Sequence, residues 1–181
     1  MKKTALLLFL LWSAGISSQI PSEIQNPEIT GLNKLPARTF IWPAPSADEA
    51  DKSSYEHSTW VRSLNGEWLL HWSPEPWLRP GDFYNPEYNR TEWKSIVVPS
   101  TLERQGFCTP IYTNSFYPFR TNPPFVTSEP AINFTTYNER YPVGSYYGYF
   151  AVPEEWDGKQ IILQLAGVSS ASSVWIKSLL Y

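Results

Sequence analysis

Hydrophobic and polar residues alternate most clearly between Asn65 and Trp72, in the stretch NGEWLLHW. Trp68, Leu70 and Trp72 occupy every second position, which is the two-residue period of a half-buried β-strand. The dipeptide Asn65-Gly66 at the start of the stretch is a strong turn signal. The pattern therefore predicts a strand that begins after this turn and directs its aromatic face towards a core.

Further stretches have the composition of strands, because β-branched, aromatic or alternating apolar residues run between turn residues. They are Ser95–Ser100, Ser145–Val152, Gln160–Leu165 and a segment that begins at Ser172. Gly148 indicates a bulge or a close backbone approach, and Asp157-Gly158 is a hairpin turn signal before Gln160. Helical periods are missing between these stretches, so we expect an all-β fold of the β-sandwich or jelly-roll type.

The stretch Pro110–Val126, PIYTNSFYPFRTNPPFV, follows neither the helical nor the strand period. Its prolines interrupt both kinds of element. Its apolar residues are nevertheless too many for a solvated linker; they are Ile111, Tyr112, Phe116, Tyr117, Phe119, Phe125 and Val126. Irregular backbone has to run at the surface, where its polar groups can be satisfied, and such loops often carry function. We interpret the stretch as a rigid binding loop.

Length and composition limit the possible classes of protein. A chain of 181 residues accommodates one domain with an arm. Seventeen prolines disfavour long helices, and an aromatic content of 16% supplies a core. The formal net charge is −3, and the chain has no basic run, so we expect no nucleic-acid partner.

The first 18 residues have the three parts of a secretory signal peptide. Lys2 and Lys3 form the positive region, Ala5–Trp12 the apolar region, and small residues then offer a cleavage site before Gln19. The apolar run is shorter than the roughly 20 residues that a membrane-spanning helix needs. We expect a periplasmic or secreted protein without membrane contact after cleavage, which takes the net charge from −3 to −5.

The remaining chain divides by composition into two parts. Residues 19–58 are rich in Pro, Ser and Asn, with an acidic patch at Asp48, Glu49 and Asp51, and we expect an extended N-terminal arm there. The strand patterns all lie in residues 59–181, which we assign to the jelly-roll domain.

Residues with catalytic chemistry show no recognisable arrangement. Cys108 is the one cysteine, so it has no internal disulfide partner, and a thiol without a role is favoured over a nucleophile. His57 and His71 lack the spacing of metal ligands, so we predict no metal site. Glycoside hydrolysis needs two carboxylates about 5–10 Å apart across the substrate. The sequence pairs none of its candidates, which are Glu67, Glu92, Glu103, Glu129, Glu139, Glu154, Glu155 and Asp157.

The aromatic residues and Asn114 admit two interpretations. Tyr and Trp can pack on sugar rings while their polar atoms bond to hydroxyls, but most of them, including Trp68 and Trp72, are better explained as core. The amide of Asn114 both donates and accepts hydrogen bonds, as a pair of sugar hydroxyls requires. An isolated Asn in a loop more commonly caps the local backbone. The residues alone leave both roles open.

The order of five segments changes this balance. NPEITGLNKLPAR, VRSLNGEWLLHW, IVVPSTLERQGF, PIYTNSFYPFRTNPPFV and the stretch from GSYYGYF to SSVWI follow one another. This order resembles the N-terminal part of bacterial β-galactosidases of glycoside hydrolase family 2. The likeness covers most of the chain from Asn26 to Ile176, and the PIYTN motif is its most specific part.

The resemblance implies a jelly-roll sugar-binding domain of galactose-binding-like fold. In the family this domain precedes an immunoglobulin-like domain and a catalytic (β/α)8 barrel, and the Asn of PIYTN contacts the galactosyl unit. That Asn matches Asn114, so the resemblance favours substrate contact for this residue. The aromatic loop would then hold Asn114 at the active site of a neighbouring domain.

Departures from the family pattern limit what this chain is expected to do. The family continues after VWI with an Asn-Gly hairpin and further strands, whereas this sequence ends at Tyr181, so we expect a truncated jelly roll. The resemblance places both catalytic glutamates, the divalent metal and the sodium in the barrel. The chain is therefore expected to have no catalytic residue, no cofactor and no hydrolytic activity alone. Its parent would be a retaining β-galactosidase, expected to be a homo-oligomer, and the alternative is a stand-alone carbohydrate-binding module.

Overall fold

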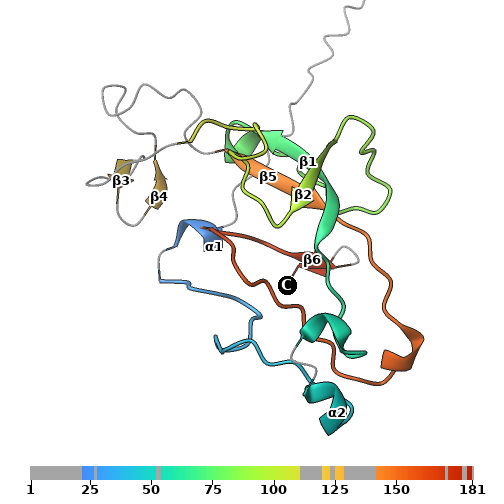
Figure 1. The fold of residues 1–181 in the computed structure, drawn as a ribbon. Helices are drawn as coiled ribbons and strands as arrows, with labels where there is room; N and C mark the ends of the chain where they lie inside the picture. The colour runs from blue at the N-terminus through green and yellow to red at the C-terminus, as the bar shows by residue number, and fades with distance from the viewer. Residues whose placement is uncertain are drawn as a thin grey trace, which may run out of the picture.

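The computed structural model describes residues 22–26, 28–51, 54–110, 120–122, 125–128, 142–169, 171–176 and 179–180. Its largest element is a three-stranded antiparallel sheet, drawn at the top of Figure 1. The strands are β1 (Gly66–Ser73), β2 (Lys94–Val98) and β5 (Val143–Tyr147), in the order β2-β1-β5. The sequence predicted all three, but β5 ends at Tyr147 and does not extend to Val152.

The register of the sheet brings three strand ends together. Gly66, the first residue of β1, pairs with Val98, the last residue of β2. On the other side of β1, Leu69 pairs with Tyr147, the last residue of β5. The beginning of β1 and the ends of β2 and β5 therefore lie at the same end of the sheet. The chain segments that follow β2 and β5 both start from there.

The core gathers around the central strand. Leu70 of β1 and Ile96 of β2 each have only 1% of their surface exposed. Phe83 and Trp93, from the segment between β1 and β2, complete the buried apolar set among the described residues. Trp68 and Trp72, which the alternating pattern predicts as core, are half-buried. Both faces of β1 are partly covered. Buried and exposed residues therefore do not alternate strictly along this strand.

Two smaller antiparallel pairs accompany this sheet. β3 (Arg120–Asn122) pairs with β4 (Phe125–Ser128), so the prediction that Pro110–Val126 contains no strand is wrong at its C-terminal end. β-branched and aromatic residues flank the prolines there, and such residues favour extended backbone. β6 (Trp175–Ile176) pairs with β7 (Leu179–Leu180) and begins three residues later than the sequence suggested.

The strand expected at Gln160–Leu165 is not formed. Ile161, Ile162, Leu163 and Leu165 of this stretch are between 39% and 53% exposed. A strand needs a hydrogen-bonded neighbour, and none of the described strands pairs with this stretch. The Asp157-Gly158 turn does occur, with Gly158 at φ +71°, but it follows a 3-10 helix and does not close a hairpin.

Helical elements in the described residues are short. α1 (Ser22–Gln25) and α2 (Ala47–Ala50) are single turns, and Ser46 caps α2 through a hydrogen bond to the backbone N–H of Glu49. The 3-10 helices are η1 (Tyr55–His57), η2 (Pro76–Leu78) and η4 (Glu154–Trp156). None of the helices in the described ranges is long and apolar enough to cross a bilayer. The fold is all-β with antiparallel sheets, as the sequence predicts.

Candidate functional site

Asn114, the one site residue that the sequence singles out, lies outside the described residues. The structure does describe the segment that leads to it, Pro99–Pro110, which we call the stem. The stem leaves the sheet at the end of β2 through the Val98–Pro99 peptide, which is cis. The stem is the described segment that directly precedes the stretch containing Asn114.

The stem is organised by its own turns. The hydroxyl of Thr101 accepts a hydrogen bond from the backbone N–H of Arg104 at 3.4 Å, and the N–H of Phe107 donates to the carbonyl of Leu102 at 2.9 Å. Gly106 has φ +79°, a left-handed conformation that glycine adopts without strain. These bonds give the stem a defined path although it has no regular secondary structure.

Charged and polar groups of the stem face β2 and β5. The carboxylate of Glu103 has its pKa held below the usual value by a backbone N–H, with smaller contributions from the Thr101 hydroxyl and the Cys108 thiol. Burial raises the pKa of the Tyr146 phenol on β5, and the negative charges that Cys108 and Glu103 can carry raise it further. The ammonium group of Lys94 on β2 lies 6.0 Å from the centre of the Phe107 ring. The stem is therefore packed on the sheet by these side chains.

A hollow of about 210 Å³ lies at the same end of the sheet. It is formed by the chain on either side of Gly66 and by the segment that follows β5, and we call it the β1 hollow. Its polar and aromatic lining comes from Arg62, Asn65, Glu67, Trp68, Tyr149 and Phe150. The sequence analysis missed this group because it treated Asn65-Gly66 only as a turn and Trp68 only as core.

A second, more open hollow of about 510 Å³ surrounds η4. Trp156 is fixed there by a hydrogen bond from its indole N–H to the carbonyl of Thr59 at 3.1 Å. The ammonium group of Lys159 lies 4.7 Å from the centre of the Trp60 ring. These contacts tie η4 to the segment before β1, and both indoles are used in packing.

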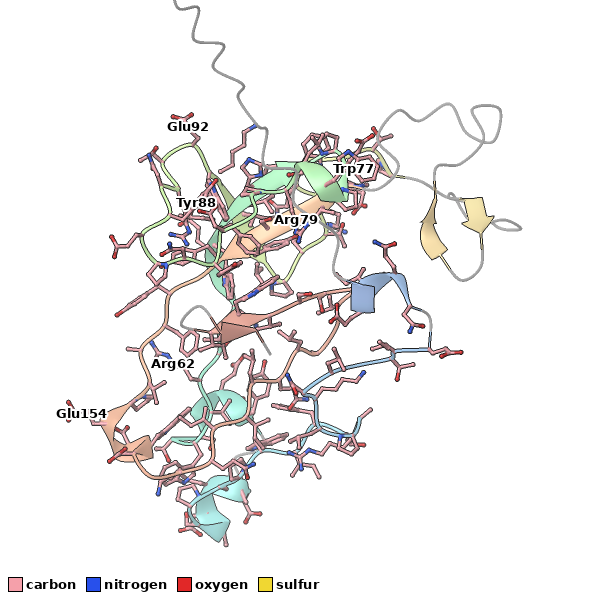
Figure 2. The ribbon with its side chains drawn as sticks, turned by 180° about the vertical axis from the view of Figure 1, so that it is seen from behind. Arg62, Trp77, Arg79, Tyr88, Glu92 and Glu154 are labelled. Atoms are coloured by element: carbon pink, nitrogen blue, oxygen red, sulfur yellow. The ribbon has the colours of Figure 1, made fainter. Side chains whose placement is uncertain are left out.

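Two of the candidate carboxylates lie apart, and a third bonds to the neighbouring strand. In Figure 2, Glu92 lies near the top of the molecule and Glu154 lies well below it on the same side. Glu67 accepts a hydrogen bond from the hydroxyl of Ser95 on the neighbouring strand. Glu129 and Glu139 are outside the described residues. Glu92 and Glu154 are therefore not placed to act on one substrate as a pair.

His71, His57 and Cys108 lie in the structure as follows. The Nδ1 atom of His71 is 3.3 Å from the hydroxyl of Ser73, and its ring packs against Trp93 with centres 5.7 Å apart. His57 is the last residue of η1, and Cys108 is half-buried in the stem. Within the described ranges, no three His, Cys, Asp or Glu side chains are grouped so that they could hold a metal ion.

Antiparallel sheets with only short helices define an all-β domain of the sandwich class. The sequence profile of the sugar binding domain of glycosyl hydrolases family 2, a jelly-roll-like domain, matches residues 61–180. The chain belongs to this family. The match includes the stem, the β1 hollow and the stretch that contains Asn114.

Two curated relatives are β-galactosidases. The chain is 36% identical over 156 residues to "Beta-galactosidase" of Priestia megaterium (strain DSM 319 / IMG 1521), which covers 86% of the chain and 14% of that protein. It is 28% identical over 167 residues to "Beta-galactosidase large subunit" of Leuconostoc lactis, which covers 84% of the chain and 25% of that protein. The chain thus spans a quarter or less of the length of these relatives.

Proposed function

We propose that this chain is the sugar-binding N-terminal part of a β-galactosidase and that its role is to bind and position substrate. The observation that carries the proposal is the 36% identity to the Priestia megaterium β-galactosidase across 86% of the chain. The parent enzyme hydrolyses terminal β-D-galactose residues with retention of configuration, and the two catalytic carboxylates belong to its barrel domain. This chain alone is inactive.

Within this role, Asn114 contacts the galactosyl unit. Its amide supplies one donor and one acceptor to adjacent hydroxyls, and the stem connects its segment to the end of β2. The support for this assignment is the match of PIYTN to the family motif, together with a stem that hydrogen bonds hold in one path. No residue of the chain takes part in bond cleavage.

An exchange of domains tests the proposal. The matching segment of the Priestia megaterium enzyme is replaced by residues 19–181 of this chain, and hydrolysis of o-nitrophenyl β-D-galactoside is measured. We expect an active chimera, because the family segment is retained, and no hydrolysis by the 181-residue chain alone. A folded chimera without activity, or turnover by the chain alone, would contradict the proposal.

The same chimera tests Asn114. Loss of hydrogen bonds to the substrate in Asn114→Ala should lower kcat/KM by about tenfold, corresponding to about 1.4 kcal/mol. Gln164→Ala, at an exposed position of residues 157–169, is the control and should leave kcat/KM unchanged. Equal values for the two variants would remove Asn114 from the site.

A further inference from the structure

The β1 hollow lies at the end of the sheet where β1 begins and β5 ends, and its lining combines several kinds of side chain. It is about 210 Å³ in volume and combines aromatic, cationic, anionic and amide side chains within one short stretch around Gly66 and another after β5. This volume is below the roughly 300 Å³ at which pockets for drug-sized ligands begin. A single small ring is therefore the largest ligand that it can enclose.

The indole of Trp68 in this hollow is held rigidly. Its N–H donates to the carbonyl of Leu64 at 2.8 Å. Gly148 approaches the ring so closely that a Cβ atom there would come within 2.7 Å of three ring atoms. Because the ring is fixed before a ligand arrives, little conformational entropy is lost when one stacks on it. Trp68 is half-buried, so part of the indole remains accessible.

A second aromatic side chain stands at the edge of the hollow. Tyr149 has 88% of its surface exposed, the highest value among the large apolar and aromatic residues of the described ranges. Burial of such a ring against protein is the usual outcome, and the described part of the chain leaves this one uncovered. An aromatic ring next to polar groups is suited to the apolar face of a sugar ring.

The polar groups of the hollow select an uncharged ligand with hydroxyls. Arg62 offers guanidinium donors, Asn65 offers a donor and an acceptor, and Glu67 offers carboxylate oxygens. All three side chains are exposed, and Figure 2 shows Arg62 on the segment that leads into β1. Ser95 donates a hydrogen bond to one carboxylate oxygen of Glu67. The opposite charges of Arg62 and Glu67 leave a charged ligand with one favourable and one unfavourable contact, whereas sugar hydroxyls can bond to both groups.

The hollow and the stem of Asn114 start from the same end of the sheet. Asn65 precedes Gly66, and Gly66 pairs with Val98, the last residue before the stem. We propose that the β1 hollow is a second sugar subsite, which binds a neutral pyranose ring against Trp68 and Tyr149. The inference rests on the proposed function, because it takes the ligand to be a galactoside or a sugar linked to one.

Binding of methyl β-D-galactopyranoside to the full chain tests the subsite, measured by saturation-transfer NMR titration. Loss of the stacking ring in Tyr149→Ala should weaken the Kd by about three- to tenfold, whereas Tyr149→Phe should keep it within twofold. Arg62→Ala should weaken the Kd to a similar extent, and Arg38→Ala, an exposed arginine of the N-terminal segment, should not. Tyr149 is so exposed that its replacement leaves folding intact.

The outcomes separate this inference from the proposed function. Binding that Asn114→Ala abolishes, and that Tyr149→Ala leaves unchanged, would overturn the subsite and retain the role of Asn114. Absence of saturation transfer from a folded wild-type chain would also overturn the subsite. In the chimeric enzyme, Tyr149→Ala should raise KM for lactose by at least threefold with kcat unchanged, and an unchanged KM would count against the proposal. Inactivity of the chimera would instead count against the proposed function alone.

Discussion

Gly148 lies where β5 gives way to the following loop, with its backbone against the indole of Trp68. The sequence predicts either a bulge or a close approach at this glycine, and the structure shows the close approach. The requirement comes from space and not from backbone conformation, because the residue is not among the glycines with positive φ. One hydrogen atom in place of a side chain thus decides where the ring of Trp68 can lie.

Gly148→Ala should therefore lower the free energy of unfolding by about 1–3 kcal/mol, because the indole has to move away from the new methyl group. The indole N–H would also leave the carbonyl of Leu64. Gly167→Ala is the matched control, since nothing lies within 4 Å of a Cβ atom there, and it should change stability by less than about 0.5 kcal/mol. Urea unfolding followed by tryptophan fluorescence measures both. Equal stabilities would show that the ring has another position available.

Among the elements, the irregular segment between β1 and β2 depends on one arginine. The guanidinium group of Arg90 donates to the carbonyls of Phe83 and Asn85 at 2.6 Å each, and to that of Tyr88 at 2.8 Å. It also lies 3.9 Å from the centre of the Tyr147 ring on β5. The arginine therefore folds the segment and attaches it to the sheet at the same time. This arrangement places Phe83 in the core and against Trp175 of β6, with ring centres 5.0 Å apart.

Removal of this group in Arg90→Ala should lower the free energy of unfolding by about 2–3 kcal/mol, because several hydrogen bonds from a charged donor are lost together. Arg90→Lys keeps the charge but not the planar fork of donors, so it should recover less than half of the loss. Arg104→Ala, at an exposed position of the stem, is the control and should be neutral. If lysine restored full stability, charge and not geometry would be the property that matters.

The sequence pattern predicted strands correctly where the stretch also has a neighbouring strand to pair with. It failed where that neighbour is missing from the described strands. The stretches that became β1, β2 and β5 carry alternating or β-branched residues, and each has a neighbour in the sheet. Gln160–Leu165 has an equally strong pattern but no partner among the described strands. Hydrogen bonding between strands depends on residues distant in sequence, and a single-strand pattern does not contain that information. Phe83 and Trp93 were missed as core residues because they lie in irregular backbone, where no period indicates burial.

The candidate site was predictable only through its motif. PIYTN is a contiguous stretch, so resemblance alone identifies Asn114. The β1 hollow joins Asn65 and Glu67 to Tyr149, more than 80 residues later in the sequence, through the register of β1 with β5. Such a group becomes visible only after the strands are paired. Two features of the sequence pointed to the hollow, namely the Asn65-Gly66 turn and the aromatic residue Tyr149 after Gly148. Taken separately, each is explained more simply by the structure, as a turn and as a surface aromatic.

For the molecule as a whole, apolar surface remains exposed in two regions of the described chain. Leu32, Leu35 and Ile41 are more than half exposed in the N-terminal segment, and Ile161 and Leu165 are about half exposed after η4. Where such residues form a contiguous patch, the surface commonly contacts another domain or a partner. We propose that the immunoglobulin-like and barrel domains of the parent β-galactosidase cover part of this surface.

We also propose that the protein is exported and that its signal peptide is removed before Gln19. Expression of the whole chain in a Gram-negative host should give a periplasmic product that lacks 18 residues, because the positive and apolar regions direct it to the secretion machinery. Intact mass and N-terminal sequencing measure the cleavage. Replacement of Leu7 and Leu8 by Arg should keep the chain in the cytoplasm. A wild-type product that retains Met1 in the cytoplasm would contradict the proposal.

The position of Cys108 has a practical consequence. It is the one thiol in the sequence, it is half-buried, and it lies in the stem six residues before Asn114. A maleimide fluorophore or spin label attached there would report from the base of the binding loop without any engineered cysteine or any competing site. The protein thus carries its own attachment point for a spectroscopic probe, six residues before the proposed sugar-contacting Asn114.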